Sequence, residues 1–437
     1  MRDIVITLIV LGSLPFALKR PWIGVLMWVW ISVMNPHRLS WGFAYDFPFA
    51  AIIAGVTLVG VVITRDPKKL PVTPITVTLI MFTLWMNLTT LFAFYPESAQ
   101  ERLSQVNKIM LMTLVTGMMI KTRRQIECLA WALMISIGYY GTKGGLFTIL
   151  TGGGNIVWGP SGSLIEGNNE VALAFITIIP IMFYLRLVSQ NKWVRRALAV
   201  SMPLCAAAAI GSYSRGALLG VAAMLFFLWI KSPKKLVPGI VMVLMIPVAI
   251  AFMPDKWTER MDTINEYQSD ASAMGRINAW KLAVNLANDR PLVGGGFELW
   301  KGPVFAKYAP DPEDPHAAHS IYFQALGEHG WVGFLLYMTL GFLTWRKGSW
   351  IIRKTEKLPE LHWAKDLATM LQVSMVGFSV GGAFLSLVYY DVQYYLMMTM
   401  VATGVLVEKH LAEQKTGTQH SFPDSRQSLR PKAVTAT

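Results

Sequence analysis

Residues 170–231 decide the fold class of this chain, and they read EVALAFITIIPIMFYLRLVSQNKWVRRALAVSMPLCAAAAIGSYSRGALLGVAAMLFFLWIK. Three apolar segments, near 170–188, 197–211 and 215–230, fill most of this stretch. Each is about 15 to 20 residues long, close to the length that a helix needs to cross the hydrocarbon core of a bilayer. A basic cluster separates the first two segments, and a short turn separates the second from the third. The stretch therefore predicts consecutive transmembrane helices.

The same pattern continues on both sides of this stretch. Because the first two segments of the chain are short and can form a bent hairpin at Pro21, the whole set predicts about 12 to 13 transmembrane helices. With 54% hydrophobic and 15% charged residues, the chain is too apolar for a water-soluble domain. No strand-length run alternates apolar and polar residues, so we expect an all-α membrane protein instead of a β-barrel. The further apolar segments lie near 4–18, 21–34, 47–64, 74–93, 105–120, 126–140, 236–253, 321–345, 367–388 and 393–408.

The basic residues give the chain a formal net charge of +13, and their placement predicts topology instead of nucleic-acid binding. They gather in short clusters between apolar segments and do not line one helix face. Because the clusters occur in alternate loops, the positive-inside rule places them in the cytoplasm, and the loops between them are then external. The clusters lie at 65–69, 121–124, 186–196, 231–235 and 346–354.

The predicted domain organisation follows from these segments. Residues 1–253 and 321–408 hold two sets of transmembrane helices, and residues 254–320 form one long external loop between them. Residues 409–437 are polar and are expected to form a disordered cytoplasmic tail.

The long external loop is the expected place of function, because it carries acidic residues, Trp, Gly and Pro, unlike the cytoplasmic loops. Helices are predicted at 255–267 and 273–287, and the second has an apolar face that includes Trp280. The Gly- and Pro-rich stretch 294–315 is expected to be irregular.

Two arginines are candidate ligands for a diphosphate. Arg215 follows Ser214 in GSYSRG, residues 211–216, at an outer junction between apolar segments, where a guanidinium is costly unless it is paired or faces water. Its external position runs against the positive-inside bias, which weakens the alternative of an arginine that only anchors a helix end. Arg276 opens the loop helix in GRINAW, and its plain alternative is a solvated helix charge. Forked donors from two separate arginines suit a pyrophosphate.

Two histidines are candidates for a general base. His316 and His319 lie in PHAAHS, residues 315–320, just before the chain re-enters the membrane. A neutral histidine can accept a proton from a hydroxyl, as glycosyl transfer requires. Their spacing also permits shared metal ligation, but no third ligand is evident, so a base is favoured. The structural alternative is a helix cap formed by His319 or Ser320.

Other motifs restrict the chemistry. Gly294 and Gly296 belong to a glycine run that resembles a phosphate-binding loop, but neither a Lys-Ser/Thr pair nor a βαβ context follows. A turn near a bound ligand is therefore expected there, and a nucleotide site is not. The acidic residues Glu166, Glu170 and Asp391 form no DxD or paired-carboxylate arrangement. A reaction without metal or cofactor is thus predicted, with a leaving group such as a lipid diphosphate stabilised by arginines.

In sequence order, these motifs resemble those of the O-antigen ligase and polymerase superfamily, over about residues 1 to 408. The resemblance rests on Ser214-Arg215-Gly216 after an apolar segment, Gly275-Arg276 with Trp280, Pro291 through Gly296, and His319-Ser320 before a helix. The opening Asn35-Pro36-His37-Arg38, within a Trp-rich run, is similar more narrowly to the ligase branch, including the O-glycosylation ligases associated with exosortase systems.

The resemblance implies a GT-C-like glycosyltransferase in the bacterial inner membrane, with its active site facing the periplasm. Such an enzyme transfers the O-antigen glycan from undecaprenyl diphosphate to a sugar of the lipid A core, with inversion. By the same resemblance, His319 would be the general base, and Arg215 and Arg276 would hold the diphosphate. The possible supporting residues are His316, Ser214, Trp280, Ser320, Gly294 and Gly296.

Three other functions remain open from the sequence. An O-antigen polymerase and a protein O-oligosaccharyltransferase belong to the same superfamily and use the same kind of donor. A flippase that only moves the lipid-linked glycan is an alternative of another class, but such transporters usually show internal repeats, and no convincing repeat occurs here. The expected partners are the lipid-linked donor, the lipid A-core acceptor and membrane lipids, and nucleic acid is not among them.

Overall fold

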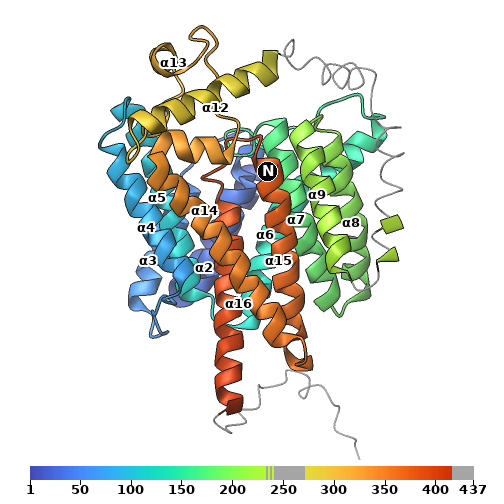
Figure 1. Ribbon diagram of the computed structural model, residues 1–437. Coiled ribbons are helices and arrows are strands. Elements are labelled where there is room, and N and C mark those ends of the chain that lie inside the picture. The colour runs from blue at the N-terminus through green and yellow to red at the C-terminus, as the bar shows by residue number, and fades with distance from the viewer. Residues whose placement is uncertain (233–234, 237–238, 241–270, 416–437) are drawn as a thin grey trace, which may run out of the picture.

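The computed structural model describes residues 1–232, 235–236, 239–240 and 271–415, and these residues form an all-helical bundle. No strand occurs within these ranges, so the predicted all-α class is confirmed. Most helices stand side by side, while α12 and α13 lie across one end of the bundle (Figure 1). At the opposite end α16 projects beyond its neighbours.

The helices before the first undescribed residues are α1 (Arg2–Lys19), α2 (Pro21–Val29), the π-helix η1 (Trp30–Met34), the 3-10 helix η2 (Pro36–Leu39), α3 (Phe49–Ile63), α4 (Pro74–Thr90), α5 (Pro96–Met119), α6 (Arg123–Leu150), α7 (Asn168–Val188), α8 (Lys192–Ile210) and α9 (Arg215–Lys231). Those after them are α12 (Ala271–Asp289), α13 (Gly302–Tyr308), α14 (Ile321–Thr355), η3 (Pro359–Leu361), α15 (His362–Gly382) and α16 (Asp391–Lys415). Every predicted apolar segment within the described ranges overlaps one of these helices.

Two stretches that were expected to be irregular are helical. The short helix α13 interrupts the predicted irregular stretch because Pro303 fits a first turn, and Phe305 and Tyr308 pack against the buried side of α12. The last helix α16 continues to Lys415 into the predicted disordered tail, where Lys409 and Glu413 form an i,i+4 ion pair. Apart from the three positions 236, 239 and 240, the predicted segments 236–253 and 255–267 lie outside the described residues, and so does the rest of the tail.

The outer faces of the bundle are apolar. Large exposed hydrophobic side chains occur along many helices, for example Leu8 on α1, Val62 on α3, Leu84 on α4 and Leu335 on α14. Among the described helices, α7 and α8 are long and apolar enough to span a membrane by length and hydropathy, and three shorter apolar stretches lie at Pro21–Met34, Phe49–Ile63 and Pro74–Thr90. Large exposed apolar side chains on so many helices indicate a membrane protein.

Two of the loops with basic clusters are in contact with each other. There, Lys121 Nζ donates a hydrogen bond to the carbonyl oxygen of Pro67, which belongs to the preceding basic loop. The guanidinium of Arg123 lies 5.2 Å from the ring centroid of Trp363, at the start of α15. The basic stretches 65–69 and 121–124 therefore lie beside each other and beside the start of α15, while α12 covers one end of the bundle (Figure 1).

Helices from the two ends of the chain pack together inside the bundle. The indole N–H of Trp28 on α2 donates a 2.7 Å hydrogen bond to the hydroxyl of Tyr395 on α16. The hydroxyl of Ser32 in η1 donates to a carboxylate oxygen of Asp391 at 3.0 Å. Because Trp28, Tyr395 and Asp391 are buried, these bonds pair polar groups that would otherwise be costly inside the protein.

A kink at Gly330 divides α14 into a short first part and a long second part. Gly330 has φ +67°, in the left-handed region, and this backbone ends the regular helical bonding of the preceding turn. The carbonyl oxygens of Gly327 and Glu328 instead accept hydrogen bonds of 2.9 Å from the N–H groups of Gly295 and Gly296. The kink thus fixes the glycine run of the preceding loop against α14.

Buried polar side chains extend this connection. The Nε2 and Nδ1 atoms of His329 lie 2.7 Å from the hydroxyls of Tyr389 and Thr89, respectively. The Tyr389 hydroxyl also donates to the carboxylate of Glu328, which accepts a further 3.0 Å bond from the indole N–H of Trp300. The network joins α4, α14, the loop before α13 and the connection before α16, so it holds the α12 end of the bundle together.

Candidate active site

Helix α12 is fixed to the loop that carries the two candidate histidines. The side-chain amide of Asn278 donates a 2.7 Å bond to the carbonyl oxygen of Asp311 and accepts a 2.9 Å bond from its N–H. Two residues later, the indole N–H of Trp280 donates a 2.7 Å bond to the carbonyl oxygen of Ala318, directly before His319. The first turns of α12 and the loop therefore form one unit.

His316 packs directly on the start of α12. A Cβ atom at Gly275 would lie 2.8 Å from Nδ1 of the His316 ring, so only glycine leaves room for this contact. The same Nδ1 lies 2.8 Å from a carboxylate oxygen of Asp314. Asp314 thereby orients the ring and leaves Nε2 as its other polar atom.

His319 has a left-handed backbone conformation just before the regular helix that follows. Its φ is +41°, and its N–H donates a 2.9 Å hydrogen bond to Oγ of Ser386. Ser320 then occupies the N-cap position of α14, but its hydroxyl makes no capping bond. This buried hydroxyl has no hydrogen-bond partner among the described residues. The predicted capping alternative for Ser320 is therefore wrong, and its hydroxyl can bond to a bound molecule.

The surroundings of His319 keep it neutral. Burial, the positive charge of Arg276 and, to a smaller extent, His316 lower the pKa of His319 from 6.5 to about 4. A neutral imidazole at pH 7 can accept a proton. Arg276 also interacts electrostatically with Glu170 on α7, so it lies between α7 and the histidine loop.

Arg215 is the first residue of α9. Ser214 caps this helix, because its Oγ accepts a 3.1 Å bond from the N–H of Ala217. The preceding turn is held by Asn168, whose side-chain amide donates a 2.7 Å bond to the carbonyl oxygen of Ser212. A cation at a helix N-terminus opposes the helix dipole, whereas an anion there would be stabilised by both the dipole and the guanidinium.

The connection after α15 brings the three parts of the site together. Phe384 packs against Gly216 next to Arg215, where a Cβ atom would lie 3.1 Å from the Phe384 Cβ. The ring of Phe384 also lies 6.5 Å, centroid to centroid, from that of Trp280. Ser386, two residues later, accepts the N–H bond of His319. Sequence reasoning placed this connection inside a helix at 367–388, but α15 ends at Gly382.

No sequence signal marks this connection, because its role is to fill space between three other elements. Phe384 and Ser386 resemble residues of any apolar segment, and the segment continues to Tyr390 without a charge. The two consecutive glycines, Gly381 and Gly382, are the one feature that could have suggested an earlier helix end.

Two predicted supporting residues do not join this group. The N–H of Gly294 donates to the carbonyl oxygen of Arg290, and the next two amides of the glycine run bond to α14. Gly294 and Gly296 have positive φ values of 60° and 77°. Their amides are therefore used within the chain, and the structure gives them a role in fixing the kink of α14 instead of the expected role beside a ligand.

Among the described residues, no three His, Cys, Asp or Glu side chains cluster closely enough to hold a metal ion. Arg276 instead lies near His319 and Glu170, and Arg215 is the first residue of α9. The donor set therefore suits an anionic group such as a diphosphate.

Comparison with known families gives two matches. Residues 200–338 match the family described as O-antigen ligase, and residues 1–190 match a family of unknown function, DUF5935. No curated protein matches the chain. The match at 200–338 supports a place in the O-antigen ligase superfamily and a ligase-type glycosyltransferase function, and it contains Arg215, Arg276 and His319.

Proposed function

We propose that this protein is an O-antigen ligase, which transfers a glycan from undecaprenyl diphosphate to a sugar of the lipid A core at the periplasmic face of the bacterial inner membrane. The observation that carries the proposal is the convergence of α9, α12 and the histidine loop on the connection after α15. The matched O-antigen ligase region contains the first three of these elements. We assign 1–253 and 321–408 to the membrane and 254–320 to the periplasmic side.

In the proposed reaction, the acceptor hydroxyl oxygen attacks the anomeric carbon of the donor sugar while the bond from that carbon to the diphosphate oxygen breaks. His319 removes the hydroxyl proton as a general base. The diphosphate leaves with the bonding electron pair, and Arg215 and Arg276 stabilise the negative charge that develops on it. A single displacement of this kind inverts the anomeric configuration, and it needs no metal because the charge is offset by guanidinium groups.

Donor binding would also adjust the base. Arg276 contributes to the low pKa of His319. A bound diphosphate would offset that positive charge, so the pKa of His319 would rise toward its ordinary value and the imidazole would become a stronger base. The base would therefore reach full strength only when the leaving group is in place.

The second histidine is assigned a supporting role. His316 is held by Asp314 and by its contact with Gly275, and its position lowers the pKa of His319. His319 adjoins the unpartnered Ser320 hydroxyl, which can bond to an oxygen of the substrate. These contacts favour His319 as the base and His316 as a residue that positions the loop.

The test uses the purified full-length protein with a glycan linked to undecaprenyl diphosphate and lipid A-core as acceptor. Glycosylated core should form, and His319→Gln should lower the rate by about 10²- to 10⁴-fold, as expected for loss of a general base. His316→Gln serves as the matched variant and should retain most activity. Full activity of the His319→Gln protein, or a larger loss in His316→Gln, would contradict the assignment.

The products separate this function from its relatives. Lengthened lipid-linked glycan without modified core would identify a polymerase, and glycan on a protein hydroxyl would identify a protein O-oligosaccharyltransferase. Movement of the donor across vesicles without any transfer would identify a flippase. Activity should survive a chelator, and loss that a divalent ion restores would refute the metal-independent mechanism.

A further inference from the structure

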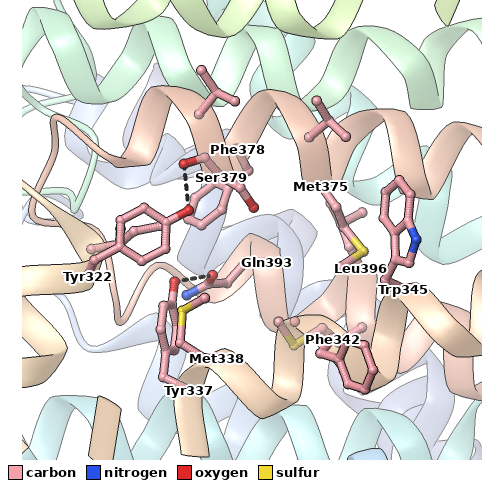
Figure 2. A pocket seen from close by; sticks show the side chains of 15 residues that line it. Tyr322, Tyr337, Met338, Phe342, Trp345, Met375, Phe378, Ser379, Gln393 and Leu396 are labelled. Atoms are coloured by element: carbon pink, nitrogen blue, oxygen red, sulfur yellow. Dashed lines mark hydrogen bonds between the residues drawn. The ribbon is translucent and has the colours of Figure 1, made fainter. Parts of the chain in front are cut away.

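A partly open groove of about 390 Å³ lies between α14, α15 and α16, and its lining is almost entirely apolar. Figure 2 shows Phe342 and Trp345 of α14, Met375 of α15 and Leu396 of α16 gathered around it. Leu396 is buried, so α16 forms the floor of the groove and the other two helices form its walls. The volume falls in the range of about 300–1,000 Å³ that is usual for ligand sites.

The two tyrosine hydroxyls in the groove are bonded to the protein. The hydroxyl of Tyr322 donates a 2.9 Å bond to the carbonyl oxygen of Ser379, and the hydroxyl of Tyr337 donates a 3.0 Å bond to Oε1 of Gln393 (Figure 2). Because these donors are satisfied, the groove offers mainly hydrocarbon, aromatic and thioether surface. Such a lining favours an occupant that is apolar along its whole length.

The groove begins beside the candidate active site. Tyr322 belongs to the first turn of α14, three residues after His319, and the neighbouring Ile321 packs against Gly382 at the end of α15. From Tyr337 to Trp345 the wall formed by α14 extends about 12 Å along the helix axis. At the far end of this wall the ring of Trp345 lies 5.2 Å from that of Phe227 on α9.

We propose that this groove binds the polyisoprenoid chain of the lipid diphosphate donor, an inference that rests on the proposed function. The occupant must be apolar along the groove and carry its charged head at the end next to Tyr322, three residues after His319, whose surroundings include Arg276. A polyisoprenoid diphosphate has this distribution, and its head would then face His319 while its chain follows α14 away from the site.

Substitution of Gly341 is the most specific way to block the groove. It lines the groove, and a Cβ atom on it would meet no heavy atom of the described chain within 4 Å. Gly341→Leu should therefore fold normally and fill the groove. Gly55 on α3 has equally open surroundings but lies outside the groove, so Gly55→Leu is the matched control.

The assay compares one glycan on two donors, undecaprenyl diphosphate and the short-chain farnesyl diphosphate, with the thermal midpoint of each variant measured in parallel. Gly341→Leu should lower kcat/KM for the long-chain donor by about tenfold or more, while the short-chain donor and Gly55→Leu remain close to wild type. Equal activity of Gly341→Leu and wild type on the long-chain donor would overturn the proposal, as would an equal loss with both donors.

A binding experiment tests the groove independently of catalysis. A polyprenyl diphosphate with a photoreactive group on its chain should label α14 and α15 around Gly341 and Met375, and Gly341→Leu should suppress this labelling. If the wild type labels there but transfers no glycan, the proposed function fails and the groove assignment stands. Labelling spread evenly over exposed helices such as α1 and α3 would overturn the groove assignment.

Discussion

The indole N–H of Trp280 donates a 2.7 Å hydrogen bond to the carbonyl oxygen of Ala318, and this bond joins the helix of Arg276 to the loop of His319. Trp280→Phe should keep the stacking on Phe323, whose ring lies 5.0 Å away, but lose the donor. We expect a loss of about 1–3 kcal/mol of stability, because the buried carbonyl is left without its partner.

The same substitution should lower glycan transfer more than stability alone explains, since it separates the proposed general base from Arg276, a proposed diphosphate ligand. The measurement is kcat/KM together with the thermal midpoint. Trp331→Phe is the control, because it removes a comparable indole bond, 3.3 Å to Asn288, at an exposed position. Equal activity of the two variants would mean that the Trp280 bond does not position His319.

The low pKa of His319 predicts that the acid limb of the pH–rate profile lies at unusually low pH. As the proposed base, His319 must be neutral, and protonation would inactivate it only below its pKa of about 4. The kcat/KM of the free enzyme should therefore persist as the pH falls from 7 to about 5, whereas a histidine at the ordinary 6.5 would already lose activity there. The limb for kcat should lie at higher pH, because bound diphosphate offsets the charge of Arg276.

Arg276→Gln gives the matched test of this limb. Removing the positive charge should raise the pKa of His319 and move the acid limb of kcat/KM to higher pH. A limb that stays in place in this variant would show that burial alone sets the pKa of His319.

Exchange of either site arginine for lysine should weaken donor binding even though the charge is kept. Lysine cannot make the forked pair of hydrogen bonds, so Arg215→Lys and Arg276→Lys should each raise the donor KM by about 10- to 100-fold. Arg123→Lys, in the basic stretch 121–124 where Arg123 pairs with Glu127, should leave KM unchanged. A donor KM that is unaffected by the two site exchanges would remove the arginines from the diphosphate site.

The kink in α14 should depend on glycine. At Gly330, a Cβ atom would lie 2.6 Å from the carbonyl oxygen of Pro291, in addition to the left-handed φ. We expect Gly330→Ala to cost about 1–3 kcal/mol or more, measured as a lower thermal midpoint in detergent. Gly302→Ala is the control, because its Cβ would meet no heavy atom of the described chain within 4 Å. A midpoint equal to that of the control would contradict the role of the kink.

The helices were predictable because lipid solvent imposes their length and apolarity, whereas the arrangement of the site was not. Periodicity predicted α12, and sequence order placed Arg276 and His319 on one loop. The sequence could not show that Phe384 lies between Trp280 and Gly216, because this packing contact joins three segments that are distant in the chain. The glycine run at 294–296 was ambiguous for a related reason, because the same residues can bind a phosphate or a helix carbonyl.

The bond between Trp28 and Tyr395 spans 367 positions of the chain, which has a consequence for biogenesis. At about 5–20 residues per second, α2 emerges from the ribosome about 20 to 70 s before the helix that supplies its partner. During that interval the early helices must rest in the bilayer with a polar indole group unpaired. Synthesis that stops before α16 should therefore leave a substrate for membrane quality control, even though most of the helices would already be inserted.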